Sequence, residues 1–209
     1  MASALAITCG SQASSTTLNS PLTSPAGSNF VADTGPGPST IIEQDILDQA
    51  ELGYRFQPPH VDFADILSVG VGRDDIPPID NPKFETIEEA KSVMNALEPV
   101  VTFKINGEAK AYPLAILTWH EVVNDVVGGV PVTVTFCPLC NSALAFERTL
   151  EGRVFDFGVS GNLRNSGLIM WDRQTQTWWQ QLTGEAIIGE LAGHKLPLIP
   201  ASIIYWADF

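Results

Sequence analysis

The chain has 209 residues, of which 44% are hydrophobic and 17% are charged, a composition that can bury a core and argues against global disorder. Its net charge of −13 comes from 24 acidic residues against 11 basic ones, and the sequence contains no cluster of Lys and Arg. This charge argues against nucleic acid and anionic membrane surfaces as partners, because both require a concentrated basic patch. No apolar run of about 18 residues is present, so the sequence predicts no membrane-spanning helix.

The N-terminal region, residues 1–40, resembles the end of a bacterial lipoprotein signal followed by a disordered tether. A short apolar stretch leads to Cys9, and the residues after it are mostly Ser, Thr, Gly, Pro and Asn, which bury too little apolar surface to offset ordering entropy. The resemblance implies lipidation at Cys9 and an extracytoplasmic protein anchored at the cell envelope, with no other contact to the membrane. The alternative is a disordered tail with an incidental cysteine, because Thr8 fits the signal pattern poorly and no basic residue precedes Arg55.

Residues 41–98 form an acidic segment rich in proline, which we expect to wrap the domain as ordered loop. Its prolines disfavour long regular elements. Short helices are expected at 41–52 and 86–97. The β-rich core domain is predicted over residues 99–209.

The first elements of the core are a hairpin, a helix and a strand. Strands at 100–105 and 108–112 flank Asn106-Gly107, a strong hairpin signal. Pro113 suits the first turn of a helix over about 113–127, which Gly128-Gly129 are expected to end. A strand at 130–136 then leads to the cysteines.

The rest of the core is predicted to be short strands. We expect a second hairpin between 142–148 and 153–159 around Glu151-Gly152, a third between 168–172 and 177–182, and strands at 186–188 and 202–206. These elements predict an α+β fold, mainly antiparallel β, with one clear helix (about 113–127) before the strand of the C-x-x-C motif. A thioredoxin fold is not expected, because residues 141–148 are too short for the long helix that its dithiol opens.

The distinctive chemical feature is the dithiol Cys137-Pro138-Leu139-Cys140. A C-x-x-C turn places two sulfurs close enough to bridge, and amides at a strand end can favour the thiolate of the first one. A thiolate is the nucleophile of disulfide exchange. The first hypothesis is therefore a thiol–disulfide oxidoreductase in which Cys137 attacks, Cys140 resolves and His120 carries the proton. It requires no cofactor, and its partner is a thiol or disulfide protein or a small thiol.

Two alternatives to redox catalysis remain open. A thiolate also binds soft metals, so Cys137, Cys140 and His120 are candidate ligands for copper or another soft metal, whereas a closed zinc site lacks ligands at suitable spacing. The third hypothesis is a non-catalytic binding module in which the two cysteines form a static structural pair. His120 itself has a structural alternative, a hydrogen bond to a backbone carbonyl.

A polar stretch at 160–166, which contains Arg164 and Asn165, can either cradle an anion or form an ordinary turn. The tryptophans at 171, 178 and 179, with Gln180-Gln181 beside them, are expected to pack in the core.

Several motifs in order resemble the family known as domain of unknown function 3179. They lie at 72–84, 106–114, 119–125, 136–143, 157–166, 171–175 and 179–186. The family has no established activity, but the selenoproteins described among its members imply redox work at the dithiol, and its members are commonly exported. The resemblance raises His120, Cys137, Cys140, Arg164, Asn165 and Asp172 as site candidates, the last three for binding. Asn141 stands where the family has Gly, and the family domain continues past residue 209.

Overall fold

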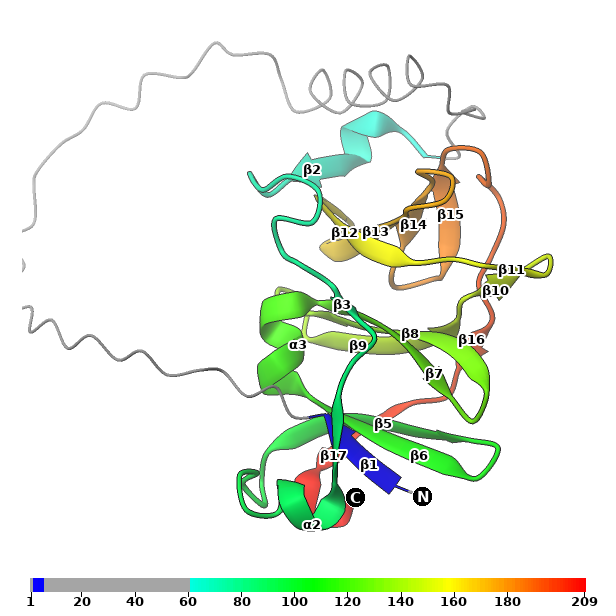
Figure 1. Cartoon of the computed structure of the whole chain (residues 1–209). Helices are drawn as coiled ribbons and strands as arrows, with labels where there is room; N and C mark the ends of the chain where they lie inside the picture. Colours follow the sequence, from blue (N-terminus) through cyan, green and yellow to red (C-terminus); the bar gives the residue numbers. More distant parts are fainter. Residues whose placement is uncertain (1, 6–60) are drawn as a thin grey trace, which may run out of the picture.

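The computed structural model describes residues 2–5 and 61–209, and it shows three β-sheets stacked in layers (Figure 1). We name the sheets lower, middle and upper from their positions in that view. Both ends of the chain lie beside the lower sheet. Within the described residues no helix is long and apolar enough to cross a membrane.

Each layer has five strands, which follow one another from edge to edge in an order that differs from their order in the chain. The lower sheet holds β17 (Ser202–Tyr205), β5 (Pro99–Ile105), β6 (Glu108–Pro113), β1 (Ala2–Leu5) and β4 (Phe84–Thr86). The middle sheet holds β16 (Leu198–Ile199), β9 (Ser142–Glu147), β8 (Val130–Cys137), β7 (Val122–Val127) and β3 (Ile79–Asp80). The upper sheet holds β15 (Glu185–Ile188), β14 (Trp178–Gln180), β13 (Gly167–Asp172), β12 (Phe157–Arg164) and β2 (Ile66–Ser68).

The remaining elements are short. They are α2 (Ile87–Ala90), α3 (Leu114–His120), the 3-10 turns η1 (Phe63–Asp65) and η2 (Trp206–Asp208), and the small hairpin of β10 (Thr149–Leu150) with β11 (Arg153–Val154). All ladders within the described residues are antiparallel except β1 with β6 and β3 with β7. The prediction of a mainly antiparallel β fold is therefore confirmed.

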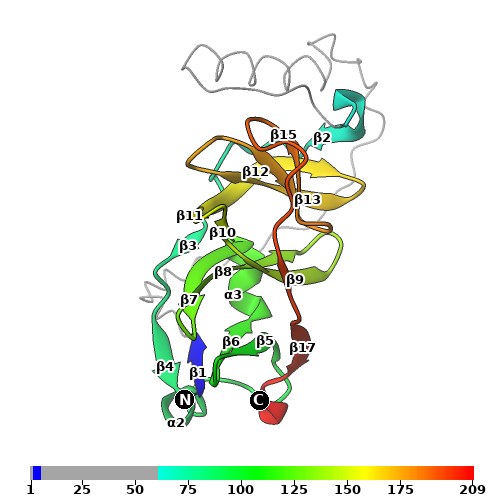
Figure 2. The same cartoon turned by 90° about the vertical axis from the view of Figure 1, so that its right-hand side faces the viewer.

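Two segments run along opposite sides of the stack and join its layers (Figure 2). Residues 66–86 supply β2, β3 and β4, which are edge strands of the upper, middle and lower sheets. Residues 185–205 supply β15, β16 and β17, which close the opposite edges of the same three sheets. Each of the two segments thus supplies one edge strand to each of the three sheets, and together they link the sheets at both edges.

The first hairpin forms as predicted, with Val101 opposite Tyr112. Asn106 and Gly107 both adopt positive φ, 48° and 87°, which a tight hairpin turn requires. The third predicted hairpin is also present, as β13 paired with β14. The second is correct at its turn but wrong in its strands. Glu151-Gly152 join only β10 and β11, while β9 pairs in the middle sheet and β12 pairs in the upper one.

The predicted helix over 113–127 is correct only in its first half. α3 ends at His120, and the Val-rich stretch that follows is β7, paired with β8 throughout. β-branched residues fit a strand better than a helix, and burial on both faces of the middle sheet removes the polar alternation that marks a half-exposed strand. Gly128-Gly129, with φ of 57° and 81°, form the turn of this β-hairpin and do not end a helix.

The segment before the core is less helical than predicted. Of the helix expected at 86–97, only α2 forms, capped by reciprocal hydrogen bonds between Thr86 and Glu89. The helix expected at 41–52 lies outside the described residues.

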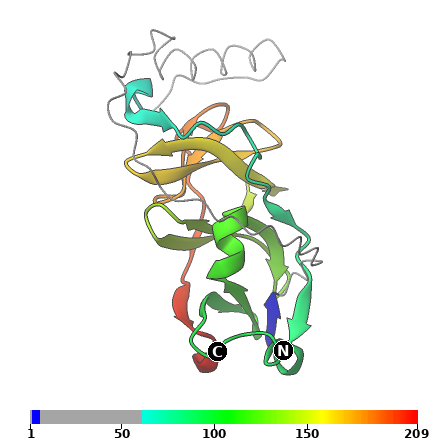
Figure 3. The same cartoon turned by 90° about the vertical axis from the view of Figure 1, so that its left-hand side faces the viewer.

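Apolar side chains fill the space on both sides of the middle sheet. Alternate residues of β7 and β8 face opposite ways, so Val122 and Cys137 pack toward the upper sheet while Val123 and Phe136 pack toward the lower one. α3 lies beside the middle sheet and contributes the buried Leu117 to the lower interface (Figure 3). This arrangement places the dithiol between the middle and upper sheets, at the end of a central strand.

Candidate dithiol site

Both cysteines of the motif are free, and they occupy the tight turn that joins β8 to β9. Cys137 is the last residue of β8 and lies opposite Ser142, the first residue of β9. Cys137 is only 2% exposed, whereas Cys140 is partly exposed and Leu139 at the tip of the turn is 72% exposed. The two sulfurs are therefore in one turn but have unequal access to solvent.

The buried thiol is held in its protonated form. Burial raises the pKa of Cys137 to about 11, and its hydrogen bond with Cys140 contributes to the rise. Its sulfur also donates to the Ser166 carbonyl oxygen at 3.9 Å, across the interface to the upper sheet. The sequence predicts the opposite shift, a lowered pKa, because Cys137 stands at a strand end. The pKa is raised because desolvation of the thiol outweighs the hydrogen bonds from backbone amides.

The second cysteine begins a chain of side-chain hydrogen bonds into the core. The Cys140 sulfur lies 2.9 Å from the Ser142 hydroxyl oxygen, and that hydroxyl donates to the Gln181 Oε1 at 3.1 Å. Gln181 Nε2 in turn donates to the Thr135 hydroxyl and to the Ser142 carbonyl, both at 3.1 Å. Gln181 is fully buried, so its amide is a fixed anchor for this chain.

The direction of each bond in this chain follows from its partners. The Ser142 carbonyl can only accept, so the Gln181 amide nitrogen must face it and the amide oxygen must face the Ser142 hydroxyl. Since Ser142 donates its one hydroxyl proton to Gln181, it accepts from the Cys140 thiol. The chain therefore holds the Cys140 thiol in one orientation.

Sequence reasoning missed the role of Gln181. In the sequence, Gln180-Gln181 stand out only as neighbours of the tryptophans. The packing that brings residue 181 to the dithiol turn is a tertiary feature, which the sequence does not show. The one signal for Gln181 in the sequence is its place beside tryptophans that are expected in the core. A glutamine buried there needs hydrogen-bond partners for its amide.

A second missed residue is Glu121, the residue that ends α3. It has a left-handed backbone, with φ of 57°, and its carbonyl accepts a hydrogen bond from the Phe136 amide at 2.8 Å. Glu121 and Cys137 line the same cavity of about 30 Å³ between the middle and upper sheets. Burial raises the pKa of Glu121 to about 7. The site therefore holds an ionisable carboxyl next to the buried thiol.

His120 does not join the two cysteines. Its ring Nδ1 lies 2.7 Å from the Pro77 carbonyl oxygen, so the structural alternative for this histidine, a contact to a backbone carbonyl, is the one observed. Among the described residues, no group of three or more His, Cys, Asp or Glu side chains lies close enough to hold a metal ion. The structure thus brings together Cys137 and Cys140, but not the three candidate copper ligands.

The three candidate binding residues are spread along the upper sheet. Arg164, at the end of β12, lies 3.5 Å from the Asp65 carboxylate, and Asn165 is in the turn before β13 with φ of 51°. Asp172 is fully buried and accepts hydrogen bonds from Thr175 and from the Trp179 indole at 2.9 Å, which order the turn that follows β13. Only the Asn165–Ser166 turn approaches the dithiol, through the Ser166 carbonyl.

Another buried polar cluster lies between the lower and middle sheets. The Lys110 ammonium is within 3.0 Å of both Asp125 carboxylate oxygens, and the Tyr112 hydroxyl donates to Asp125 at 2.8 Å. The ammonium also lies 4.3 Å from the centre of the Phe84 ring. This cluster pairs its charges internally, which is typical of a structural ion pair.

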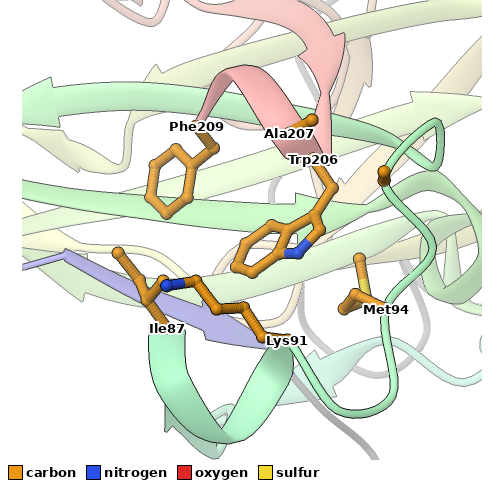
Figure 4. A pocket seen from close by; sticks show the side chains of 7 residues that line it. Ile87, Lys91, Met94, Trp206, Ala207 and Phe209 are labelled. Atoms are coloured by element: carbon orange, nitrogen blue, oxygen red, sulfur yellow. The ribbon is translucent and has the colours of Figure 1, made fainter.

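A pocket of about 290 Å³ lies at the far end of the molecule, against the outer face of the lower sheet (Figure 4). Its walls come from α2, the turns that follow it and residues 206–209, and they are mainly apolar, including Met94, Trp206 and Phe209. Its one ionisable side chain, Lys91, lies 2.7 Å from Glu88. Its lining includes no cysteine, serine or histidine, so this pocket offers no alternative to the dithiol as a candidate site for thiol chemistry.

Comparison with known proteins places this site in a family. Residues 73–209 match the family described as protein of unknown function (DUF3179), a range that includes Glu121, both cysteines of the turn and Gln181. No curated protein and no solved structure matches the chain. Since the match covers more than half of the sequence, the chain belongs to the DUF3179 family of proteins of unknown function.

Proposed function

We propose that the domain is a thiol–disulfide oxidoreductase that cycles Cys137 and Cys140 between a dithiol and a disulfide. The observation that carries this proposal is the unequal pair of free sulfurs in one turn: Cys140 is partly exposed and oriented by Ser142, whereas Cys137 is buried. Exchange requires one sulfur that a partner can reach and a second that closes the ring from within.

We assign the roles in the opposite order to the one expected from the sequence. Cys140 is the attacking sulfur, because access limits which thiol meets a partner disulfide, and Cys137 is the resolving sulfur, because its high pKa keeps it protonated until the partner is bound. The exposed Leu139 beside Cys140 offers an apolar contact to a protein partner. The partner class is a protein or small-molecule disulfide, or a dithiol in the reverse direction.

The reaction balances without a cofactor. The Cys140 thiolate attacks one sulfur of the partner disulfide, forms a mixed disulfide and releases the other partner sulfur as a thiolate. Cys137 then loses its proton and attacks the Cys140 sulfur, which closes the Cys137–Cys140 bond and releases the second partner thiolate. The partner gains two electrons and two protons, and the domain loses the same number.

Redox titration of a Cys9→Ser variant against glutathione buffers tests this proposal, because that variant keeps only the two thiols of the turn. Both thiols are expected to disappear together with one reduction potential, and either Cys137→Ser or Cys140→Ser should abolish the two-electron transition. Two thiols that stay unreactive in every buffer, as a static structural pair would, contradict the proposal. Metal retained by the purified protein, and lost in Cys140→Ser, would favour the soft-metal alternative.

We also propose, from the sequence, that the domain is extracytoplasmic and lipid-anchored through Cys9, which lies outside the described residues. Signal cleavage before Cys9 would remove β1, so the lower sheet of the anchored protein would lack this strand. Labelling of cells with a radioactive fatty acid should mark the wild-type protein and not Cys9→Ser. Equal labelling of both proteins, or of neither, contradicts the anchor.

A further inference from the structure

The cavity beside the dithiol joins two ionisable groups that come from different elements. Its volume of about 30 Å³ suffices for one or two water molecules, and it is lined by both Glu121 and Cys137. The other lining residues are uncharged: Val69, Ile76, Leu139, Val159, Gly161, Asn162, Leu163 and Leu168. Glu121 and Cys137 therefore border one small, mainly apolar space.

Backbone contacts fix Glu121 in this place. Its amide donates to the Leu117 carbonyl at 2.7 Å, and its carbonyl accepts from the Phe136 amide at 2.8 Å, one residue before the buried thiol. The positive φ of 57° is an uncommon conformation for glutamate, and a residue held in it by its surroundings is a candidate for function. The backbone of Glu121 is thus anchored to the strand that carries Cys137.

Charged groups on the neighbouring elements are paired elsewhere. His120 contacts the Pro77 carbonyl, and on the segment before β3 Asp75 accepts from the Gly72 amide. Asp74 accepts from the Val159 amide and Trp171, and lies 3.5 Å from Arg173.

On β12, Arg164 lies 3.5 Å from Asp65. Across the turn, Cys140 contacts Ser142. The cause of the raised pKa of Glu121 is burial, which brings its titration to about 7, a suitable range for proton transfer near neutral pH.

We infer that Glu121 accepts the proton of the Cys137 thiol when the disulfide closes and returns it when the disulfide opens, directly or through water in the shared cavity. This inference rests on the proposed redox function. In the closing step the Glu121 carboxylate takes the proton from Cys137, the Cys137–Cys140 bond forms, and the partner thiolate leaves. The carboxyl then releases the proton to solvent, so charge and electrons balance. In the opening step the carboxyl protonates the departing Cys137 thiolate.

A chromogenic aromatic disulfide, 5,5′-dithiobis(2-nitrobenzoate), separates the two steps in the Cys9→Ser protein. Cys140 attacks the reagent and releases a first coloured thiolate, and Cys137 then closes on the mixed disulfide and releases a second. Glu121→Gln should leave the first phase unchanged and slow the second by at least about tenfold near pH 7, the lower range of general-base effects. The pH dependence of the second phase near 7 should disappear.

His120→Gln is the matched control, because it changes the adjacent residue that the sequence named as proton carrier. Its second phase should remain at the wild-type rate. A second phase that is slowed by His120→Gln and unaffected by Glu121→Gln overturns the assignment to Glu121 and leaves the redox function intact. Release of only one coloured thiolate by the Cys9→Ser protein contradicts the redox function itself.

A measurement on the unsubstituted carboxyl covers the case in which Glu121→Gln does not fold. Infrared spectra of the Cys9→Ser protein should show a carboxyl that titrates near 7 and whose midpoint moves when the disulfide closes. The absence of any carboxyl titration in this range overturns the inference.

Discussion

The two interfaces between the sheets bury ionisable groups among different neighbours. Between the lower and middle sheets, the ammonium of Lys110 meets the carboxylate of Asp125 and the hydroxyl of Tyr112, so every charge has a partner. Between the middle and upper sheets, Cys137 and Glu121 share a cavity whose other walls carry no charge. The first arrangement stabilises fixed charges, whereas the second raises the pKa of both groups and so favours their uncharged forms.

This difference indicates at which of the two interfaces a change of protonation is expected. A buried ion pair is costly to disturb and has little capacity to change protonation. A buried carboxyl whose pKa is about 7 changes protonation at modest cost near neutral pH, whereas a thiol whose pKa is about 11 gives up its proton there only to a neighbouring base. Substitutions at the two interfaces should therefore affect different measurements: stability at the lower one, and pH-dependent reactivity at the upper one.

Removal of Lys110 should have the largest effect on stability. Lys110→Met leaves the Asp125 carboxylate buried without its counter-ion, and the expected loss is about 3–5 kcal/mol of unfolding free energy. Denaturant unfolding measures it, with Lys104→Met, an exposed lysine of β5, as the control expected near zero. Adding Asp125→Asn to Lys110→Met should recover part of the loss. A double variant less stable than the single one would contradict the role assigned to this pair.

Loss of the Gln181 amide should come next. Gln181→Met keeps the volume but leaves the Ser142 and Thr135 groups without their buried partner, at a cost of about 1–3 kcal/mol. Because Ser142 then no longer holds the Cys140 thiol in one orientation, disulfide closure should also slow. Gln181→Glu, which keeps the acceptors but removes both donated bonds, is the matched comparison in denaturant unfolding. Unchanged stability and closure in both variants would remove Gln181 from the site.

The features that the sequence predicts correctly follow from local rules. Asn106-Gly107 specify their hairpin without help from the rest of the chain, because few residues tolerate two successive positive φ values. The dithiol can also be predicted from the sequence, because its two cysteines are close in the chain and form one C-x-x-C motif. The Val122–Val127 stretch was assigned wrongly because its burial on both faces of the middle sheet, which decides for a strand, is a tertiary property.

The site residues that the sequence did not predict reach the dithiol from other strands. Glu121 lies beside Cys137 only because α3 ends at residue 120, and the predicted helix would have carried it onto a helical face. Gln181 depends on the pairing of the upper sheet and its packing on the middle one. Glu121 carries no local signal, and the signal at Gln181, a glutamine beside tryptophans, does not point to the dithiol.

The titration of Glu121 should make stability depend on pH. Because the folded pKa is raised from 4.5 to about 7, this carboxyl contributes full stability below about pH 4.5 and loses it as the pH rises through about 7. Between pH 5 and 8 the wild type should therefore lose about 1–2 kcal/mol relative to Glu121→Gln, a range discounted for partial exposure. Denaturant unfolding at several pH values measures this difference. If the unfolding free energies of the two proteins changed with pH in parallel, the raised pKa of Glu121 would be contradicted.

The smallest effect is expected at Arg164, which the sequence placed among the binding residues. Its ion pair with Asp65 is long and partly exposed, so Arg164→Gln should change stability by less than about 1 kcal/mol. It should leave both phases of the chromogenic reaction unchanged. A slower reaction with a protein disulfide alone would show that Arg164 helps to bind the partner.

The most direct test of the central claim is the order in which the two sulfurs react. Brief alkylation of the reduced Cys9→Ser protein near neutral pH, followed by mass spectrometry of its peptides, identifies the first residue modified. We predict that Cys140 is labelled first and that Cys137 is labelled only after unfolding or at a pH approaching 11. Labelling of Cys137 before Cys140 would contradict the assigned roles.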